Sequence, residues 1–264
     1  MDFPLQLLTN DYLEEYLHRA KINWDEAIAA LKARSSFEKA DFEYYIQSSA
    51  VYSSNIEGNS IDFDSYLKNK RFKIKSKPKE TSEIDDLVSA YNYAISNPLN
   101  EKNFMQAHSL LSRHILSLKS QRGKLRTQAV GIYSQGKLEY MAIEAENLEA
   151  EFGKLFADIK TLLGQELSLP EIFYYAAMMH LLFEKIHPFM DGNGRAGRLL
   201  EKWFLSSKIG EIAWGIPSEE YYAKHKAQYY QNIHIGLNYY ELRMAKCLPF
   251  LLMLVKALLP QRTG

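Results

Sequence analysis

The sequence predicts a mainly α-helical protein with one small β-hairpin. Apolar residues recur at intervals of three and four over most of the 264 residues, which is the period of an amphipathic helix. Between residues 123 and 143 this period gives way to alternation, which is typical of short strands. At the average helix length of globular proteins, a chain of this size forms a bundle of roughly ten helices.

The N-terminal region predicts two helical segments. Residues 9–33 have the period of one or two helices, with Thr9 or Asn10 as the capping residue. Residues 37–57 form the second segment. It should end at Gly58, because glycine readily adopts the left-handed conformation that follows a helix C-terminus.

The next segments differ in charge. Residues 68–79 are rich in Lys and Arg, and we expect a solvated surface loop there rather than a site for acidic partners. Helices are then predicted from about 81 to 96 and over 104–118. The second of these contains His108 and His114, both expected to be structural.

Alternation around Ser134-Gln135-Gly136 predicts a hairpin within about 127–143. A two-stranded hairpin is marginally stable alone, so it should pack on the rest of the protein. The helical period resumes over about 144–163.

The most informative stretch joins two helices. The period predicts a helix over 170–186 with Pro170 in its first turn, and Pro188 disfavours the helical conformation at the residue before it. A second helix is expected over 195–207. We call residues 187–198 the signature loop. Because it leads into a helix N-terminus, it is a natural place to bind an anion.

The signature loop contains the groups needed to hold a polyphosphate. Gly192 and Gly194 let backbone amides approach phosphate oxygens without a Cβ in the way. Arg195 and Arg198 are three residues apart on a helix and can reach the same anion. Asp191 offers the oxygen ligand that Mg²⁺ takes together with substrate phosphates.

Three other phosphate- or metal-binding loops are excluded. A dinucleotide-binding glycine loop follows a strand, whereas here a helix precedes the glycines. A P-loop requires Lys followed by Ser or Thr, and this sequence has Arg198-Leu199 instead. An EF-hand requires a third acidic ligand and a glycine, and here Arg195 and Ala196 occupy those positions.

The C-terminal region returns to helices. Residues 216–220 predict a helix start with Ser218 as its cap, and residues 221–235 are rich in aromatic side chains. Residues 248–260 are the most apolar run. They are too short to span a bilayer and are expected to form a core helix.

Composition excludes several classes of protein. Lys and Arg balance Asp and Glu at 32 each, so no overall field attracts nucleic acid. A single cysteine, Cys247, rules out internal disulfides and fits a reducing compartment. No basic-then-apolar signal begins the sequence. We therefore expect a cytoplasmic protein that binds neither nucleic acid nor a membrane.

The signature loop resembles that of the Fic family, His-x-Phe-x-Asp/Glu-Gly-Asn-Gly-Arg-x-x-Arg, and every specified position is filled. Members of that family mostly transfer AMP from ATP to a protein hydroxyl. The resemblance thus implies a Fic-type helical bundle and a protein adenylyltransferase that uses ATP and Mg²⁺. It implies His187 as the general base and Asp191 as the Mg²⁺ ligand. The nucleotide-binding residues that it implies are Gly192, Asn193, Gly194, Arg195 and Arg198.

The hairpin resembles the Fic flap, which pairs a segment of the target protein as an added strand. The physics agrees, because an exposed edge strand is a template for an extended peptide, although a hairpin can also be a mere connection. The docking residues that the resemblance implies are Val130, Gly131, Ile132 and Tyr133. Tyr229 and Tyr230 stand where family members often place residues around the adenine. The family's tryptophan is missing from residues 237–240, which leaves the choice of base open.

Ser53-x-x-x-Glu57-Gly58 resembles the inhibitory motif of the Fic family, on a helix of about 40–57. Family members hold this glutamate against the second signature arginine, which here is Arg198. The two motif side chains are one helical turn apart and face the same way. The negative end of the helix dipole disfavours Glu57, so a cationic partner elsewhere would explain it. A solvent-exposed glutamate is the alternative.

The resulting expectation is a chain in three parts. These are an N-terminal helical region carrying the inhibitory helix (1–96), a Fic core with the flap and the signature loop (97–215), and C-terminal helices packed on the core (216–264). The expected activity is AMP transfer to a Ser, Thr or Tyr hydroxyl. Removal of AMP, transfer of another phosphate-containing group, and a catalytically idle nucleotide-binding module are the alternatives. A target strand on the flap, self-modification and a homodimer are compatible with the sequence, which leaves the target protein and the oligomeric state open.

Overall fold

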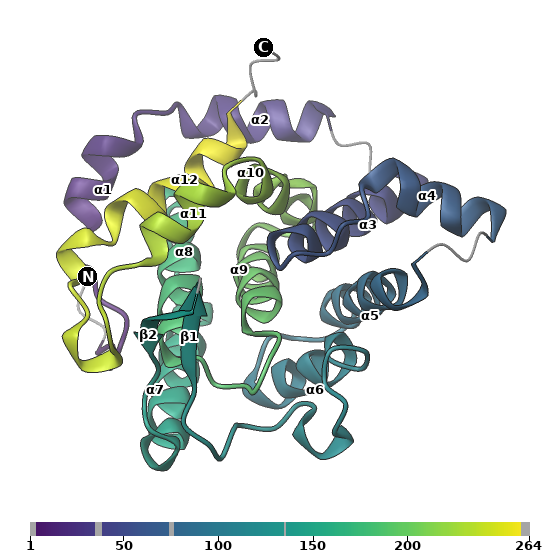
Figure 1. Ribbon diagram of the computed structural model, residues 1–264. Coiled ribbons are helices and arrows are strands. Elements are labelled where there is room, and N and C mark those ends of the chain that lie inside the picture. The colour runs from purple at the N-terminus through teal and green to yellow at the C-terminus, as the bar shows by residue number, and fades with distance from the viewer. Residues whose placement is uncertain (1–3, 35–38, 74–76, 135, 260–264) are drawn as a thin grey trace.

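The computed structural model describes residues 4–34, 39–73, 77–134 and 136–259 (Figure 1). Within these ranges the chain forms twelve α-helices, four short 3₁₀ helices and one two-stranded antiparallel sheet, which confirms the predicted fold class. The α-helices are α1 (Leu13–Ala20), α2 (Trp24–Arg34), α3 (Lys39–Ile56), α4 (Phe63–Phe72), α5 (Pro78–Ile95), α6 (Glu101–Leu111), α7 (Ala145–Leu163), α8 (Leu169–Ile186), α9 (Asn193–Ile209), α10 (Ser218–Lys224), α11 (Lys226–Ile233) and α12 (Leu248–Leu258). The strands are β1 (Gly131–Ser134) and β2 (Lys137–Met141).

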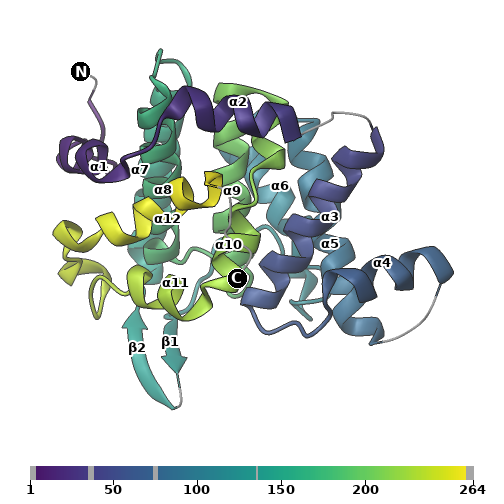
Figure 2. The ribbon, with the colours of Figure 1, turned by 90° about the horizontal axis from the view of Figure 1, so that it is seen from above.

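Helices α8 and α9 form the centre of the bundle, with α7 beside α8 and α5 and α6 on the other side of α9 (Figures 1 and 2). Every residue of α8 from Glu171 to Ile186 is buried, as expected for a helix surrounded by others. Its start is fixed by a capping box, in which Ser168 and Glu171 satisfy each other's backbone amides. The signature loop joins α8 to α9 and includes the start of α9, so the buried centre of the bundle positions it.

Helix α3 is fastened to this centre by a buried polar cluster. Lys202 on α9 donates to Ser49 on α3 over 2.7 Å and pairs with Glu219 on α10. Glu219 in turn accepts a hydrogen bond of 2.6 Å from the Tyr91 hydroxyl of α5. A buried ion pair of this kind is costly to break on one side only, so the end of α3 is held firmly against the core.

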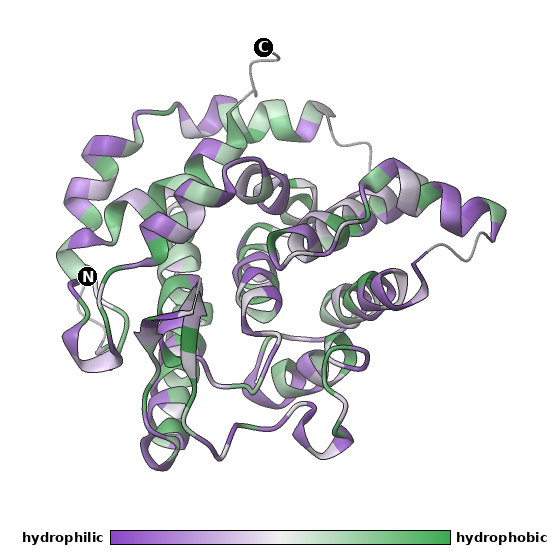
Figure 3. Cartoon of the chain, in the orientation of Figure 1, coloured by the Kyte–Doolittle hydropathy of each residue, from purple (hydrophilic) through white to green (hydrophobic). Residues whose placement is uncertain are grey.

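Most predicted helices are confirmed with shifts of a few residues at their ends. The segment 9–33 is two helices, α1 and α2, and the core helix at 248–260 is α12, which Figure 3 shows as mostly hydrophobic. Cys247 is buried, as an apolar residue would be. None of the helices in the described ranges is long and apolar enough to cross a membrane. The division of the chain at residues 96 and 215 stays a prediction.

The predicted surface loop at 68–79 is wrong for residues 68–72, which are helical, whereas residues 74–76 lie outside the described residues. Helix α4 runs to Phe72 and α5 already begins at Pro78. The Asp62 side chain caps α4 by accepting from the Ser65 amide over 2.9 Å, and Tyr66 is buried. Lys68, Lys70 and Arg71 thus lie on the exposed face of an amphipathic helix, which Figure 3 shows as largely hydrophilic.

Two further predictions of local structure are wrong. Helix α6 ends at Leu111 rather than 118, because Asp86 of α5 accepts bonds from both the backbone amide and the ring of His114. Ser218 does not cap α10 but is its first residue. Its hydroxyl donates instead to Glu219 over 3.2 Å, as part of the buried cluster.

The hairpin is confirmed. Gly131 pairs with Met141, and a bulge follows Ile132. The outer edge of β2 is partly covered, because the Met141 amide donates to the Leu237 carbonyl over 2.9 Å. Figure 2 shows the hairpin projecting from the bundle. Strand β1 therefore offers the more open edge of the sheet.

Candidate active site

A cavity of about 960 Å³ opens in front of the signature loop. It is lined by the residue that follows α3, the first turns of α5, the flap, the last turn of α8, the signature loop itself and α11. Of the predicted site residues, His187, Asp191, Gly192, Asn193, Gly194, Arg195, Glu57, Tyr229, Tyr230, Ile132 and Tyr133 line it. The fold thus brings together residues that are far apart in the sequence, from Glu57 to His234.

His187 leaves α8 in the left-handed conformation, with φ of 52° and ψ of 61°. The sequence correctly excluded the right-handed α conformation before Pro188, and the helix end selects this alternative, because the His187 amide still donates to Phe183 over 2.9 Å. A non-glycine residue at positive φ is strained and needs support from its surroundings.

Arg126 provides that support. Its buried guanidinium donates to the His187 carbonyl over 2.8 Å and to the Gln128 carbonyl over 2.7 Å, and it also bonds Ile143 after the flap. Its backbone amide donates to Pro188 over 2.9 Å. Arg126 therefore ties the base of the flap to the start of the signature loop. The sequence does not reveal this role, because a single arginine near a predicted hairpin has no distinguishing pattern.

The middle of the signature loop is braced from within and from α6. The Asn193 side chain accepts from the Phe189 amide and donates to its carbonyl, both over 2.9 Å. The His108 ring stacks on Phe189 with centroids 3.5 Å apart and contacts the Asp191 carbonyl over 3.0 Å. Gly192, at φ of 82°, then starts α9. The free amides of this first turn face the cavity as an anion site.

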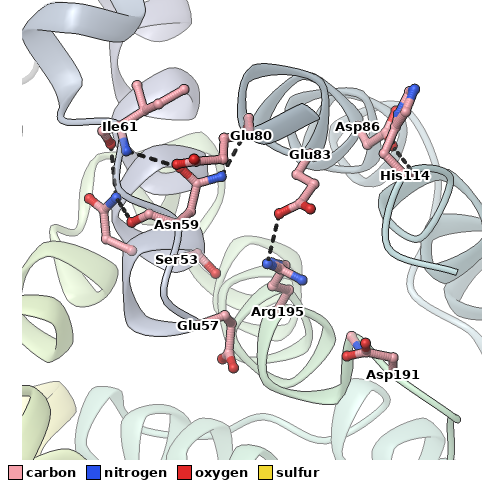
Figure 4. A network of polar contacts seen from close by, with 12 residues as sticks. Ser53, Glu57, Asn59, Ile61, Glu80, Glu83, Asp86, His114, Asp191 and Arg195 are labelled. Carbon is pink, nitrogen blue, oxygen red and sulfur yellow. Dashed lines mark hydrogen bonds and ion pairs between the residues drawn. The ribbon is translucent and has the colours of Figure 1, made fainter. Parts of the chain in front are cut away.

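The carboxylate of Asp191 is exposed to the cavity (Figure 4). Its Oδ1 accepts from the Gly192 amide over 2.6 Å, and Oδ2 accepts no bond from the described residues. The described residues contain no cluster of three metal-binding side chains. One free carboxylate beside an anion site nevertheless fits Mg²⁺, which commonly takes one or two carboxylates, waters and substrate phosphates.

His187 is poised as a neutral base. Burial lowers the pKa of its imidazole to about 4, because the charged form loses its hydration. At neutral pH the ring is therefore unprotonated and can accept a proton from a hydroxyl group in the cavity.

Arg198 is completely buried and held by α3 and the residue that follows it. Its Nη2 donates to Glu57 Oε1 over 2.7 Å and to the Ser53 carbonyl over 3.0 Å, and its Nε donates to the Ser53 hydroxyl over 2.8 Å. Partial burial alone would raise the pKa of Glu57, but the charge of Arg198 outweighs it and lowers the pKa below its usual value. The expected Glu57–Arg198 ion pair is thus present.

The Glu57 carboxylate also occupies the anion site. A Cβ atom built on Gly194 would lie 2.1 Å from Glu57 Oε1 and 3.2 Å from Arg198 Nη1. The carboxylate therefore lies directly over the glycine backbone of the first turn of α9. A phosphate group bound there would have to share this space with Glu57.

Arg195 has a carboxylate partner that the sequence did not predict. Its Nη2 lies 3.4 Å from Glu83 Oε2, which reaches across from α5 (Figure 4). Nothing in the local sequence around Glu83 signals this pairing, because it depends on how α5 packs beside α9. Both signature arginines are therefore held by carboxylates of the N-terminal helices or their ends.

The two predicted adenine-side tyrosines differ in environment. The Tyr229 ring is buried, and its hydroxyl accepts from Arg198 over 3.2 Å and contacts His180 over 3.0 Å. Tyr230 is 43% exposed, and its hydroxyl donates to the Ile56 carbonyl over 3.0 Å. Both line the cavity, and a role around a base stays a prediction.

The four predicted docking residues lie along β1 and just before it. The Val130 carbonyl accepts from the Ala142 amide over 3.1 Å, which keeps the base of the flap closed. Tyr133 is 65% exposed, and with Ile132 it lines the cavity. A peptide added to the β1 edge would therefore pass the mouth of the cavity.

Comparisons with known proteins show which family the chain is similar to. The model of the Fic/DOC family matches residues 98–205. Proteins described as protein adenylyltransferase Fic are 27% identical over 216 residues in Culex quinquefasciatus and 26% identical over 214 residues in Aedes aegypti. These alignments cover 80% and 76% of this chain but 41% and 39% of the relatives. The chain therefore spans about two fifths of the length of the curated relatives that it matches.

A solved structure supports the same fold. The crystal structure of a Fic family protein from Desulfovibrio desulfuricans matches with a TM-score of 0.75 at 20% identity, over 97% of this chain and 74% of that chain. At this level of identity the likeness concerns the fold. It extends beyond the matched segment 98–205 to the helices that carry Glu57 and Tyr229.

Proposed function

Residues 98–205 form a Fic/DOC-family domain, and from that premise we propose that this protein transfers AMP from ATP to a hydroxyl group of a protein. The observation that carries the proposal is the convergence of three features in one cavity. These are a neutral histidine, His187, the free amides at the start of α9, and the two arginines of that helix, of which Arg195 lines the cavity and the buried Arg198 pairs with Glu57 at its wall. Binding alone would require only the last two.

In the proposed reaction the acceptor hydroxyl attacks the α-phosphorus of ATP. A new bond forms between the hydroxyl oxygen and that phosphorus, the bond to the β-phosphate oxygen breaks, and pyrophosphate leaves. His187 takes the proton of the hydroxyl, for which its neutral ring is ready at pH 7. The free amides of Asn193 and Gly194 at the start of α9 and the two arginines would hold the phosphate oxygens where charge develops.

Asp191 would hold Mg²⁺ at the phosphates. Bound there, the ion supplies positive charge that neutralises the phosphate oxygens. The Asp191 carboxylate is oriented for this by its bond from the Gly192 amide. Proton transfer and binding of the phosphates are carried out by residues of the protein itself.

We expect the Mg²⁺ dependence of ATP binding to disappear in Asp191→Ala, because Asp191 is the sole carboxylate of the signature loop. The measurement is ATP affinity at increasing Mg²⁺ concentration in both proteins. Glu139→Ala, which removes another carboxylate that lines the cavity, serves as the control and should retain the dependence. Identical Mg²⁺ curves for wild type and Asp191→Ala would contradict this assignment.

The proposed acceptor is a Ser, Thr or Tyr hydroxyl on an extended segment that pairs with the open edge of β1. This geometry follows from the partial cover of β2 by residues 237–240, and it would present a side chain at the mouth of the cavity. Self-modification is proposed as the first reaction to look for, because it needs no knowledge of the target.

The test of the proposed function is incubation with labelled ATP, CTP, GTP and UTP in turn. Protein-bound label is then identified by mass spectrometry. The proposal expects an AMP group on a hydroxyl side chain, and preference for another nucleotide would identify a different transferred group. Nucleotide binding without any protein-bound label, in the presence of a cell extract as a source of acceptors, would favour an idle binding module.

We further propose that Glu57 inhibits the transfer. Its carboxylate neutralises Arg198 and lies over Gly194, so the outer phosphates of ATP cannot be gripped in the pose needed for attack. The same ionised carboxylate could instead position water for removal of AMP from a modified protein. Loss of all labelling when Glu57 is replaced would favour that second role.

A further inference from the structure

The last turn of α8 places a lysine in the cavity outside the signature loop. Lys185 is only 3% exposed, and it lines the cavity together with His187. Residues two apart on a helix point in nearly opposite directions. Here His187 follows the helix in the left-handed conformation, and this turn brings both side chains to the same cavity.

The ammonium group of Lys185 has few compensating contacts. Its Nζ lies 4.3 Å from the ring centroid of Tyr140 on β2, and the Tyr140 hydroxyl donates to the Lys185 carbonyl over 2.7 Å. Among the described residues, Nζ forms no ion pair or hydrogen bond. Burial lowers the pKa of Lys185 to about 8, although the charge of Glu184 offsets part of the effect. A buried cation in this position is costly unless an anion joins it.

Lys202 shows what a structural lysine looks like in the same fold. It is as deeply buried, but its Nζ donates to Ser49 over 2.7 Å and to the Ile216 carbonyl over 2.9 Å, and it pairs with Glu219. The ammonium group of Lys202 is therefore fully paired within the protein. Lys185 instead presents its charge to the cavity.

The position of Lys185 beside the proposed base indicates which anion it binds. The α-phosphorus must lie next to His187, because the hydroxyl that His187 deprotonates attacks it. Arg195 and Arg198 belong to α9 and are already paired with Glu83 and Glu57. Lys185 lies on α8 and forms no ion pair with the described residues. Its positive charge can therefore bind a phosphate without breaking such a pair.

On the basis of the function proposed above, we propose that Lys185 is a further catalytic residue, whose ammonium group binds the α-phosphate of the nucleotide. It would hold a non-bridging oxygen of the phosphoryl group while the acceptor hydroxyl attacks. Lys185 keeps its protons throughout, since the proton of the hydroxyl passes to His187 and pyrophosphate leaves with the broken bond. Its contribution is positive charge where negative charge develops.

The first test measures binding and does not depend on transfer. AMP and adenosine differ by the α-phosphate alone, so calorimetric affinities for both are compared in wild type and Lys185→Met. A lost hydrogen bond to a charged group should weaken AMP binding by about tenfold or more and leave adenosine binding unchanged. Equal changes for the two ligands, or no change for AMP, would overturn the proposal whether or not the protein transfers AMP.

The matched control is Lys79→Met, the same substitution at an exposed lysine that lines the cavity from α5. It should leave AMP affinity unchanged, which separates a contact of Lys185 from a general change of charge in the cavity. Thermal unfolding of each variant checks that it is folded. If Lys185→Met does not fold, Lys185→Gln is measured in the same way.

The second test concerns catalysis and the source of the anion. In a Glu57→Gly background, Lys185→Met should lower AMP transfer by about 10²-fold, and Lys185→Arg should lose less because it keeps the charge. Cleavage of ATP to AMP by water should fall in parallel, since it uses the same α-phosphate without an acceptor. If cleavage and AMP affinity are both unaffected and only the KM for the acceptor rises, Lys185 binds an acidic group of the acceptor and the proposal is wrong.

Discussion

Glu57→Gly is expected to raise AMP incorporation by about 10²-fold or more over the wild type. The substitution removes the carboxylate that pairs with Arg198 over 2.7 Å and lies over Gly194. Both the arginine and the backbone amides then become available to the outer phosphates of ATP. The measurement is incorporation of labelled AMP into the protein itself or into added acceptors.

Two controls make this result specific. Glu57→Gly combined with Arg198→Ala should stay low, because the released arginine is then missing. Glu57→Gln removes only the charge and should act in the same direction, whereas Glu43→Gln on the exposed part of α3 should not. Equal labelling by wild type and Glu57→Gly would reject the inhibitory role.

His187→Ala is expected to lower transfer by about 10²–10⁴-fold and to leave ATP binding nearly intact. His187 stands at the start of the signature loop, before the amides that hold phosphate, so its loss removes the base without removing the anion site. Transfer rates and ATP affinities are measured in the Glu57→Gly background, with His18→Ala on the exposed side of α1 as the control. Full activity of His187→Ala would remove this residue from the mechanism.

The lowered pKa of His187 determines how the rate of transfer should depend on pH. Since burial holds its pKa near 4, the base is neutral above that value and takes up a proton only as the pH falls through it. His187 should therefore not limit transfer between pH 8 and about pH 5, a range in which an unperturbed histidine with a pKa of about 6.5 would become protonated. A limb of the pH profile near 6.5 that disappears in His187→Ala would contradict this assignment of its charge.

The parts of the site that the sequence predicted are those that depend on local order. The signature loop carries its chemistry within twelve consecutive residues, and its two flanking helices have a clear apolar period. The contact between Glu57 and Arg198 spans 141 residues and was expected only through the resemblance of Ser53 and Glu57 to a known motif.

The parts that the sequence did not predict depend on packing. Glu83 meets Arg195 because α5 lies beside α9, and Arg126 holds His187 because the flap folds back on α8. Lys185 did leave a signal, since it stands in a mostly apolar helix and two residues before the proposed base. The lysine-rich composition around α4 does not predict a helix, because the burial of Tyr66 that stabilises this segment depends on packing against the rest of the protein.

The most direct test of AMP transfer uses ATP labelled at either the α- or the γ-phosphate. Glu57→Gly, alone and with His187→Ala, is incubated with each, and the protein and the released products are separated. We predict protein-bound label from α-labelled ATP only, release of the γ-label as pyrophosphate, and neither in the His187→Ala variant. Protein-bound γ-label, or the absence of protein-bound α-label with every acceptor tried, would contradict it.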